Sequence, residues 1–196
     1  MSDVFDQPDG AATPLEDEEK QGLKLSSIAY RHELNAAEQE NILLGQDWAL
    51  RQRARTLLSE AFIRDLHRHM FGDVWEWAGK FRKSAKNIGI DHWEIPVALR
   101  HLVDDATTWI EANAYPPDEI AVRFHHRLVQ IHPFANGNGR HARMMADLLL
   151  RQLGKPLLSW GRGSLRDPGQ LRKEYIAALR AADKHDIHPL LAFARS

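Results

Sequence analysis

Residues 131–143, IHPFANGNGRHAR, place two histidines, two glycines, two asparagines and two arginines directly before an apolar stretch, MMADLLL. Gly137 and Gly139 permit backbone conformations and close approaches that a Cβ atom would block. A helix that begins near Gly139 leaves its first amide N–H groups unpaired at the positive end of its dipole. Helix N-termini of this kind bind anions, and phosphate is their usual ligand. The run therefore predicts a phosphate-binding loop.

The same run supplies positive charge and a base. Arg140 and Arg143 are three residues apart, so both can rise from one face of the first helical turn. Two guanidinium groups suit an extended polyphosphate better than a single carboxylate. His132, with an ordinary pKa near 6.5, is mostly neutral at pH 7 and can accept a proton from an attacking hydroxyl. Each feature alone is usually structural, but their occurrence together predicts group transfer from a nucleotide.

The segments around this loop predict an all-α domain of about seven helices with a small β-hairpin. Helical patterns cover residues 35–53, 60–72, 96–113, 116–129, 139–153, 168–182 and 186–194. Ser59 is the expected N-cap of the second helix and Gly72 its end. In the helix over 96–113 the residues expected to point inward are Val97, Leu99, Leu102, Val103, Ala106 and Trp109.

Residues 78–95, AGKFRKSAKNIGIDHWEI, fit no helical period, and their apolar residues lie in short segments around Asn87-Ile88-Gly89. This pattern predicts the β-hairpin. Residues 1–30 are acidic at their start and contain Pro and Gly, so we expect an N-terminal arm there and one domain over residues 31–196.

The composition is that of one soluble globular domain. The chain has 196 residues, 43% of them hydrophobic and 27% charged, with a formal net charge of -1. This balance gives no general attraction to nucleic acid or anionic membranes, so neither is an expected partner. No cysteine is present, which excludes disulfides, thiolate metal sites and Cys nucleophiles. The start of the chain does not resemble a signal peptide, and no run approaches the ~18 apolar residues of a membrane span. We therefore expect a cytoplasmic location.

The stretch HPFANGNGR, followed by Arg143, resembles the Fic-domain signature HPFxxGNGRxxR at every fixed position. The segments WEWAGKFR at 75–82, FHHRLVQIHPF at 124–134 and YIAALRAAD at 175–183 are similar to the Fic subgroup called mobile mystery protein B. The resemblance extends from about residue 13 to the end of the chain. It implies a Fic-type helical bundle with a β-hairpin flap.

The resemblance also implies an activity, the transfer of AMP from ATP to a Ser, Thr or Tyr hydroxyl of a target protein, with Mg²⁺. His132 would be the general base, and Arg140 and Arg143 would hold the β- and γ-phosphates. The residues implied for the phosphate cradle are Gly137, Asn138 and Gly139. Such chemistry depends mainly on positioning and charge neutralisation.

Two further residues carry implied contacts. Asn136 stands where the family often has Asp or Glu, so it is the implied Mg²⁺ ligand, without the negative charge that strengthens binding. Tyr175 is expected to contact the base of the nucleotide. Related enzymes use other donors, so a phosphotransferase with another nucleotide donor is one alternative. A catalytically weak nucleotide-binding regulator is a second, favoured by Asn136.

In the family, a target segment pairs with the edge of the hairpin as an added strand, and residues 83–90 would serve here. The candidate target-docking residues are Lys83, Lys86, Asn87, Ile88, Gly89 and Ile90. Eleven histidines also raise a zinc-hydrolase alternative. However, HExxH is absent, and adjacent histidines such as His125 and His126 point to different helix faces.

Many Fic proteins inhibit themselves through a helix that carries [S/T]xxxE[G/N], whose Glu pairs with the second motif arginine, here Arg143. The helix predicted over 35–53 begins NAAEQENILLG. Glu40-Asn41 fits the final pair, but Ala36 stands at the Ser/Thr position. Glu38 is the rival candidate, favoured by the subgroup pattern EQxNI. Both residues stay candidates for the inhibitory Glu. Self-modification and a homo-oligomer are further possibilities that the sequence leaves open.

Overall fold

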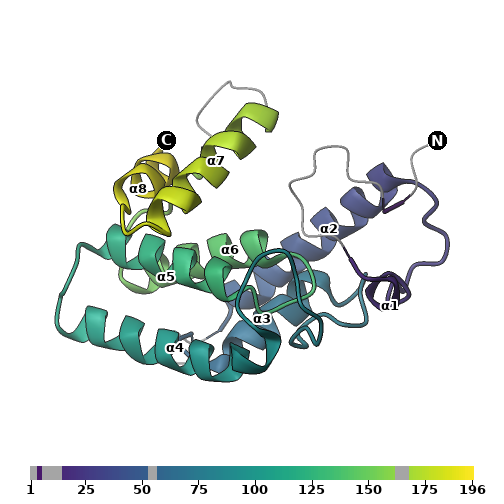
Figure 1. The fold of residues 1–196 in the computed structure, drawn as a ribbon, viewed down its shortest axis with the longest axis horizontal. Helices are drawn as coiled ribbons and strands as arrows, with labels where there is room; N and C mark the ends of the chain where they lie inside the picture. Colours follow the sequence, from purple (N-terminus) through teal and green to yellow (C-terminus); the bar gives the residue numbers. More distant parts are fainter. Residues whose placement is uncertain (1–3, 6–14, 53–56, 162–167) are drawn as a thin grey trace.

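The computed structural model describes residues 4–5, 15–52, 57–161 and 168–196, and within them the protein is helical (Figure 1). The elements are α1 Asp17–Lys20, α2 Arg31–Leu50, α3 Glu60–Phe71, the 3-10 turn η2 His92–Glu94, α4 Ile95–Glu111, α5 Pro117–Ile131, α6 Asn138–Gln152, α7 Pro168–Ala182 and α8 His188–Arg195. The predicted all-α fold class is confirmed.

Helices α5 and α6 form the centre of the bundle and pack against each other, with residues 132–137 between them (Figure 1). Helix α4 packs on α5, and α2 packs on α3. At one end α7 and α8 pack as a pair, and α8 also packs against α5 of the bundle. The loop singled out in the sequence therefore joins the two central helices.

Helix α3 begins and buries its apolar face as its sequence predicts. The Ser59 hydroxyl accepts a hydrogen bond of 3.1 Å from the Phe62 amide, and the helix ends before Gly72. The buried side chains of its predicted face are Phe62, Ile63, Leu66 and Met70. A capped start and an apolar stripe at helical spacing act together here.

In helix α4, one residue that was predicted to point toward the core does not do so. Leu99, Leu102 and Ala106 are fully buried, whereas Val97 is 50% exposed. The buried stripe begins at Ile95, and a residue two positions later lies about 200° further round the helix. Val97 therefore points away from the core, and its predicted inward direction was wrong.

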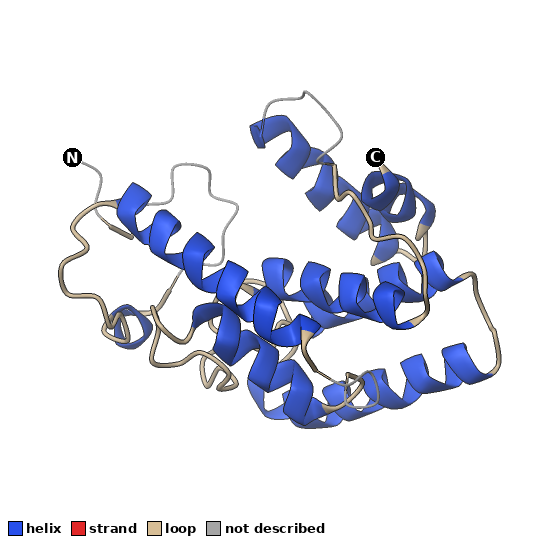
Figure 2. Cartoon of the chain, turned by 180° about the vertical axis from the view of Figure 1, so that it is seen from behind, coloured by secondary structure: helices blue, strands red, loops and turns tan. Residues whose placement is uncertain are grey.

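The predicted β-hairpin is also wrong, because residues 78–95 form turns and the η2 segment but no strand (Figure 2). The segment folds around the buried guanidinium of Arg82 instead. Arg82 donates to the carbonyls of Ser84 and Ile90 within the segment and to the carbonyl of His132 outside it. These bonds draw the backbone around one side chain, so no cross-strand ladder forms. Gly89, with φ +97°, completes the turn.

Residues 15–30 pack against residues 74–77. The Lys24 amide donates to the Val74 carbonyl at 2.9 Å, and Leu23 and Trp75 form an isolated antiparallel bridge. The Trp77 indole donates to the Glu19 carbonyl at 3.0 Å. The rest of the predicted arm, residues 1–3 and 6–14, lies outside the described residues, as does the last residue of the predicted helix over 35–53. The boundary after residue 30 stays a prediction.

In the described part of the chain, no helix is both long enough and apolar enough to cross a membrane.

Candidate functional site

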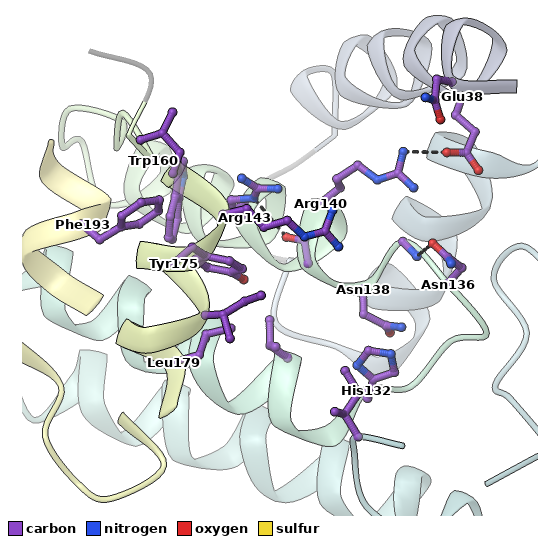
Figure 3. A pocket seen from close by; sticks show the side chains of 18 of the residues that line it. Glu38, His132, Asn136, Asn138, Arg140, Arg143, Trp160, Tyr175, Leu179 and Phe193 are labelled. Atoms are coloured by element: carbon purple, nitrogen blue, oxygen red, sulfur yellow. Dashed lines mark hydrogen bonds and ion pairs between the residues drawn. The ribbon is translucent and has the colours of Figure 1, made fainter. Parts of the chain in front are cut away.

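The loop between α5 and α6 begins at His132, which is in the left-handed conformation with φ 53° and ψ 60°. For a residue other than glycine this conformation costs about 1–2 kcal/mol. The His132 amide donates to the Leu128 carbonyl at 3.2 Å and so ends α5. This sharp turn directs the chain away from α5 and leaves the His132 side chain at the cavity described below (Figure 3).

Asn138 closes the loop on itself. Its Oδ1 atom accepts from the Phe134 amide at 2.9 Å, and its Nδ2 atom donates to the Phe134 carbonyl at 2.8 Å. Asn136 makes a shorter turn, in which its Oδ1 atom accepts from the Gly137 amide at 2.6 Å. The side chain of Asn138 is thus a structural brace, and its predicted place in the phosphate cradle can be filled only by its backbone.

The two glycines of the loop differ in whether the fold requires a glycine at that position. Gly137 has φ +78°, and a Cβ atom there would lie 2.6 Å from the Phe71 ring. At Gly139 a Cβ atom would meet only the Tyr175 hydroxyl, at an ordinary 3.7 Å. Gly137 is therefore needed by the fold, whereas the open space above Gly139 lies at the N-terminus of α6, where an anion would sit.

Arg140 and Arg143 both rise from the first turns of α6, as predicted (Figure 3). The guanidinium of Arg143 lies over the Tyr175 ring, 5.5 Å from its centre. That of Arg140 lies over the Phe71 ring at 4.9 Å and reaches across to Glu38. Both cations line one cavity with the loop glycines.

This cavity, of about 540 Å³, has a polar half and an apolar half. The polar half contains His132, the start of α6 and the two arginines. The apolar half is lined by Trp160, Leu171, Tyr175, Leu179 and Phe193. Only Tyr175 of this second group was predicted, since the others are scattered over 34 positions of α7, α8 and the loop before them without a shared motif. An apolar chamber beside a cationic cradle suits a ligand with a flat ring at one end and phosphates at the other.

Buried histidines surround the cavity in their neutral form. Burial, and after it the charges of Arg82 and Lys86, lowers the pKa of His132 to about 4. The imidazole is therefore free to accept a proton throughout the neutral pH range. Burial likewise lowers the pKa of His125 to about 3, and its Nε2 atom lies 3.1 Å from the Tyr175 hydroxyl. Tyr175 keeps its proton, because burial raises its pKa to about 12.

Known proteins share both the sequence and the fold of this site. Residues 57–150 match the model of the Fic/DOC family. These residues form a Fic domain. The chain is similar to the protein adenylyltransferase Fic of Drosophila mojavensis, with 30% identity over 165 residues, which are 80% of this chain and 32% of the relative. The chain spans about a third of the length of the curated relatives that it matches.

Solved Fic structures agree with this assignment. Fic-1 from C. elegans superposes with a TM-score of 0.62 and 27% identity, over 89% of this chain and 56% of that one. BepC of Bartonella tribocorum, solved with bound AMPPNP, has a TM-score of 0.70 and 16% identity, over 92% of this chain and 97% of that one. The second likeness shows the fold alone.

In this Fic domain the carboxylate that reaches the cradle belongs to Glu38. Its Oε2 atom lies 2.7 Å from Nη1 of Arg140, and its Oε1 atom accepts from the Trp75 indole at 2.8 Å. Glu40, the rival candidate, is exposed to solvent on the same helix. The predicted pairing with Arg143 is wrong, because α2 packs over the start of α6, where Arg140 lies, and Arg143 is three residues further along.

The predicted target-docking residues separate into three groups. Lys83, Asn87 and Ile88 are exposed, and Ile88 also lines the cavity. The Lys86 ammonium lies 2.5 Å from Oε2 of Glu19 in α1, so it holds residues 15–20 to this segment. The other two lie against the site: a Cβ atom added at the exposed Gly89 would be 2.6 Å from the Cβ atom of His132, and the carbonyl of the half-buried Ile90 accepts from Arg82.

Two residues that hold the site were not predicted. His67 of α3 is fully buried, and its Nε2 atom lies 3.1 Å from the Asn136 carbonyl. Its Nδ1 atom accepts from the Gly79 amide at 3.0 Å, and its ring stacks on Phe134 with 3.7 Å between ring centres. Arg82 is the second; it stands in the segment WEWAGKFR, whose similarity to the Fic subgroup was the available signal.

A metal site built by the protein alone is not present among the described residues, where no three His, Cys, Asp or Glu side chains gather. Asn136 offers a neutral oxygen at the edge of the cavity, and that oxygen already accepts the Gly137 amide. An amide oxygen has two lone pairs and can accept a hydrogen bond and bind a cation at the same time. This donor set fits Mg²⁺ only as the companion of phosphate oxygens and water.

Proposed function

We propose that this Fic domain transfers AMP from ATP to the hydroxyl of a Ser, Thr or Tyr side chain on a target protein. The observation that carries the proposal is the single cavity in which His132, two arginines, the N-terminus of α6 and an apolar chamber meet. The name of its relatives, protein adenylyltransferase Fic, supports the choice of AMP as the transferred group. The AMPPNP bound in the BepC structure supports the choice of an adenine nucleotide.

The two halves of the cavity divide the nucleotide between them. The base lies among the aromatic and aliphatic side chains of α7 and α8, with Tyr175 against it. The phosphates lie above Gly139, where the first amides of α6 and both arginines stabilise their charge. Such a placement sets the α-phosphate between the base chamber and the cationic cradle.

His132 acts on the target rather than on the nucleotide. Its neutral imidazole accepts the proton of the target hydroxyl, whose oxygen attacks the α-phosphate while the bond to pyrophosphate breaks. The arginines and the amides of α6 stabilise the charge that develops on the leaving group. Mg²⁺, held by the phosphates with Asn136 as its protein ligand, would neutralise further phosphate charge.

The target approaches beside residues 83–90. Among the exposed residues of this segment, Lys83, Asn87 and Ile88 have the longer side chains, and we assign them to target contact. The contact is made by side chains, because this segment carries no strand to which a target strand could pair.

Glu38 restrains the reaction in this proposal. Its ion pair with Arg140 occupies a cation that would otherwise hold a phosphate, which supports an inhibitory role for this carboxylate. Release of this pair, by replacement of Glu38 or by a partner, frees Arg140. Self-modification then serves as the simplest assay, since it requires no known target.

Two labels on ATP separate this function from its alternatives. The protein and its Glu38→Gly variant are incubated with Mg²⁺ and ATP labelled at the α-phosphate or at the γ-phosphate. Protein labelled only from the α position supports AMP transfer, whereas label only from the γ position means a phosphotransferase. If nucleotide binds but neither label is transferred, the regulator is the correct alternative, which Asn136 and the Glu38–Arg140 pair favour.

A further inference from the structure

A single arginine outside the signature motif connects the catalytic loop to the segment that covers it. Arg82 is only 4% exposed. Its Nε atom donates to the His132 carbonyl at 2.7 Å and its Nη1 atom to the Ser84 carbonyl at 2.8 Å, while Nη2 donates to the Ile90 carbonyl. Its own amide donates to the Pro133 carbonyl at 2.9 Å. Arg82 thus forms hydrogen bonds both to the loop that begins at His132 and to the segment over residues 84–90 that covers it.

The bond to His132 meets the most unusual backbone in the site. His132 is a residue other than glycine in the left-handed region, and this geometry must be held by its surroundings. On the other side, Gly89 lies so close that a Cβ atom there would be 2.6 Å from the His132 Cβ and 2.9 Å from Nη2 of Arg82. His132 is therefore held between a guanidinium at its carbonyl and a glycine at its side chain.

We propose that Arg82 is a positioning residue for His132: its guanidinium holds the left-handed backbone of His132 and the covering turn at residues 84–90 in one arrangement, which directs the imidazole into the cavity. The proposal rests on the proposed function only in giving His132 the role of base. The arrangement itself is read from the hydrogen bonds and can be tested without transfer.

The chemistry of the site requires arginine rather than any cation. Three carbonyls around one side chain are matched by the planar fork of a guanidinium, whose N–H groups point in fixed directions. A lysine ammonium is a flexible point charge and would keep the charge but not the three directed bonds. Lysine therefore separates the geometric part of the role from the electrostatic part.

The effect of the Arg82 charge can be measured as a change in the pKa of His132. The cations facing its imidazole are Arg82 and, with its Glu19 partner, Lys86, and across the cavity lie Arg140 and Arg143. Loss of the Arg82 charge should raise the pKa of His132 by roughly one unit, while burial keeps it below its ordinary value. Arg82→Lys should leave that pKa close to the value in the unchanged protein.

The experiment compares Arg82→Lys, Arg82→Met and a matched control, Arg64→Met. Arg64 also donates to a backbone carbonyl nearby, that of Gly79 at 3.1 Å, but does not contact the catalytic loop. The pKa of His132 is followed by NMR titration of its ring proton, and amide hydrogen exchange is measured over residues 82–91, both without nucleotide. Transfer from α-labelled ATP is measured in the same proteins.

Both Arg82 variants should show faster exchange over residues 82–91, and Arg82→Met should raise the pKa of His132. Transfer should fall by ~10²-fold in Arg82→Lys with the KM for ATP unchanged, since a misplaced base affects chemistry more than nucleotide binding. The control should change none of these. Unchanged exchange and unchanged pKa in the variants overturn the proposal whether or not the protein transfers AMP, and unchanged transfer in folded Arg82→Lys overturns it too. If Arg82→Met does not fold, Arg82→Lys alone decides through exchange and transfer.

Discussion

Replacing Glu38 by Gln removes its negative charge and keeps its shape. The Oε1 atom that accepts from Trp75 is retained, while the oxygen that faces Arg140 at 2.7 Å becomes an amide nitrogen. A charge-assisted hydrogen bond contributes ~1.5–3 kcal/mol when it is made. Because the Arg140 side chain is 36% exposed, solvent screening favours the lower end of that range. ATP must break this pair before Arg140 can bind a phosphate, so its affinity should rise by roughly 10-fold in Glu38→Gln.

Isothermal titration with ATP and Mg²⁺ measures this affinity directly. Glu40→Gln is the matched control, since Glu40 lies on the same helix, carries the same charge and is exposed. We expect the control to bind ATP as the unchanged protein does. If Glu38→Gln also binds ATP with unchanged affinity, the Glu38–Arg140 pair does not compete with nucleotide and the inhibitory interpretation is refuted.

Three substitutions and a change of pH test the loop and its supports. Gly139→Ala should keep the thermal stability but weaken ATP binding at least ~10-fold, because its methyl group enters space the protein leaves open. Gly137→Ala should instead lower the free energy of unfolding by about 2 kcal/mol or more. Unchanged ATP binding in Gly139→Ala would place the phosphates elsewhere. Asn136→Asp should tighten Mg²⁺ binding in a metal titration of the nucleotide complex, and no change would mean that this oxygen does not touch the ion. Acid should destabilise the fold between pH 7.5 and 5.5 by roughly 5 kcal/mol in denaturant titrations. The cause is the lowered folded-state pKa of four buried histidines, whose unfolded forms take up protons first as the pH falls below 6.5; a stability that is unchanged or higher at pH 5.5 would contradict it. These histidines are His67, His125, His132 and His141.

Local sequence signals predicted the helices well, because each signal acts within a few residues of the feature it determines. The Ser59 cap, the apolar stripe of α3 and the prolines that open α4 and α5 are of this kind. The loop between α5 and α6 was also predictable, since the left-handed Gly137 and the start of α6 are determined by consecutive residues. The cavity that they line together with His132, Arg140 and Arg143 was not predicted.

The parts that were missed depend on contacts between distant residues. The segment over 78–95 has short apolar stretches around Asn87-Ile88-Gly89, which predicted a hairpin. Its carbonyls are instead bound by the buried guanidinium of Arg82, and no local pattern reveals where that side chain points. The choice of Glu38 over Glu40, and of Arg140 over Arg143 as its partner, depends on how α2 crosses α6. The apolar chamber requires α7 and α8 to fold back over α5, and single aromatic residues such as Trp160 carry no sign of that.

The role of His132 as the base of an AMP transfer in this cavity is tested most directly by comparing transfer and binding in His132→Ala. Both are measured in the Glu38→Gly background, with α-labelled ATP for transfer and isothermal titration for binding. Transfer should fall by ~10²–10⁴-fold, because the proton of the target hydroxyl has no acceptor. ATP affinity should stay close to that of the parent, because the phosphates are held by α6 and its arginines. Transfer that continues at the parental rate in His132→Ala would show that His132 is not the base.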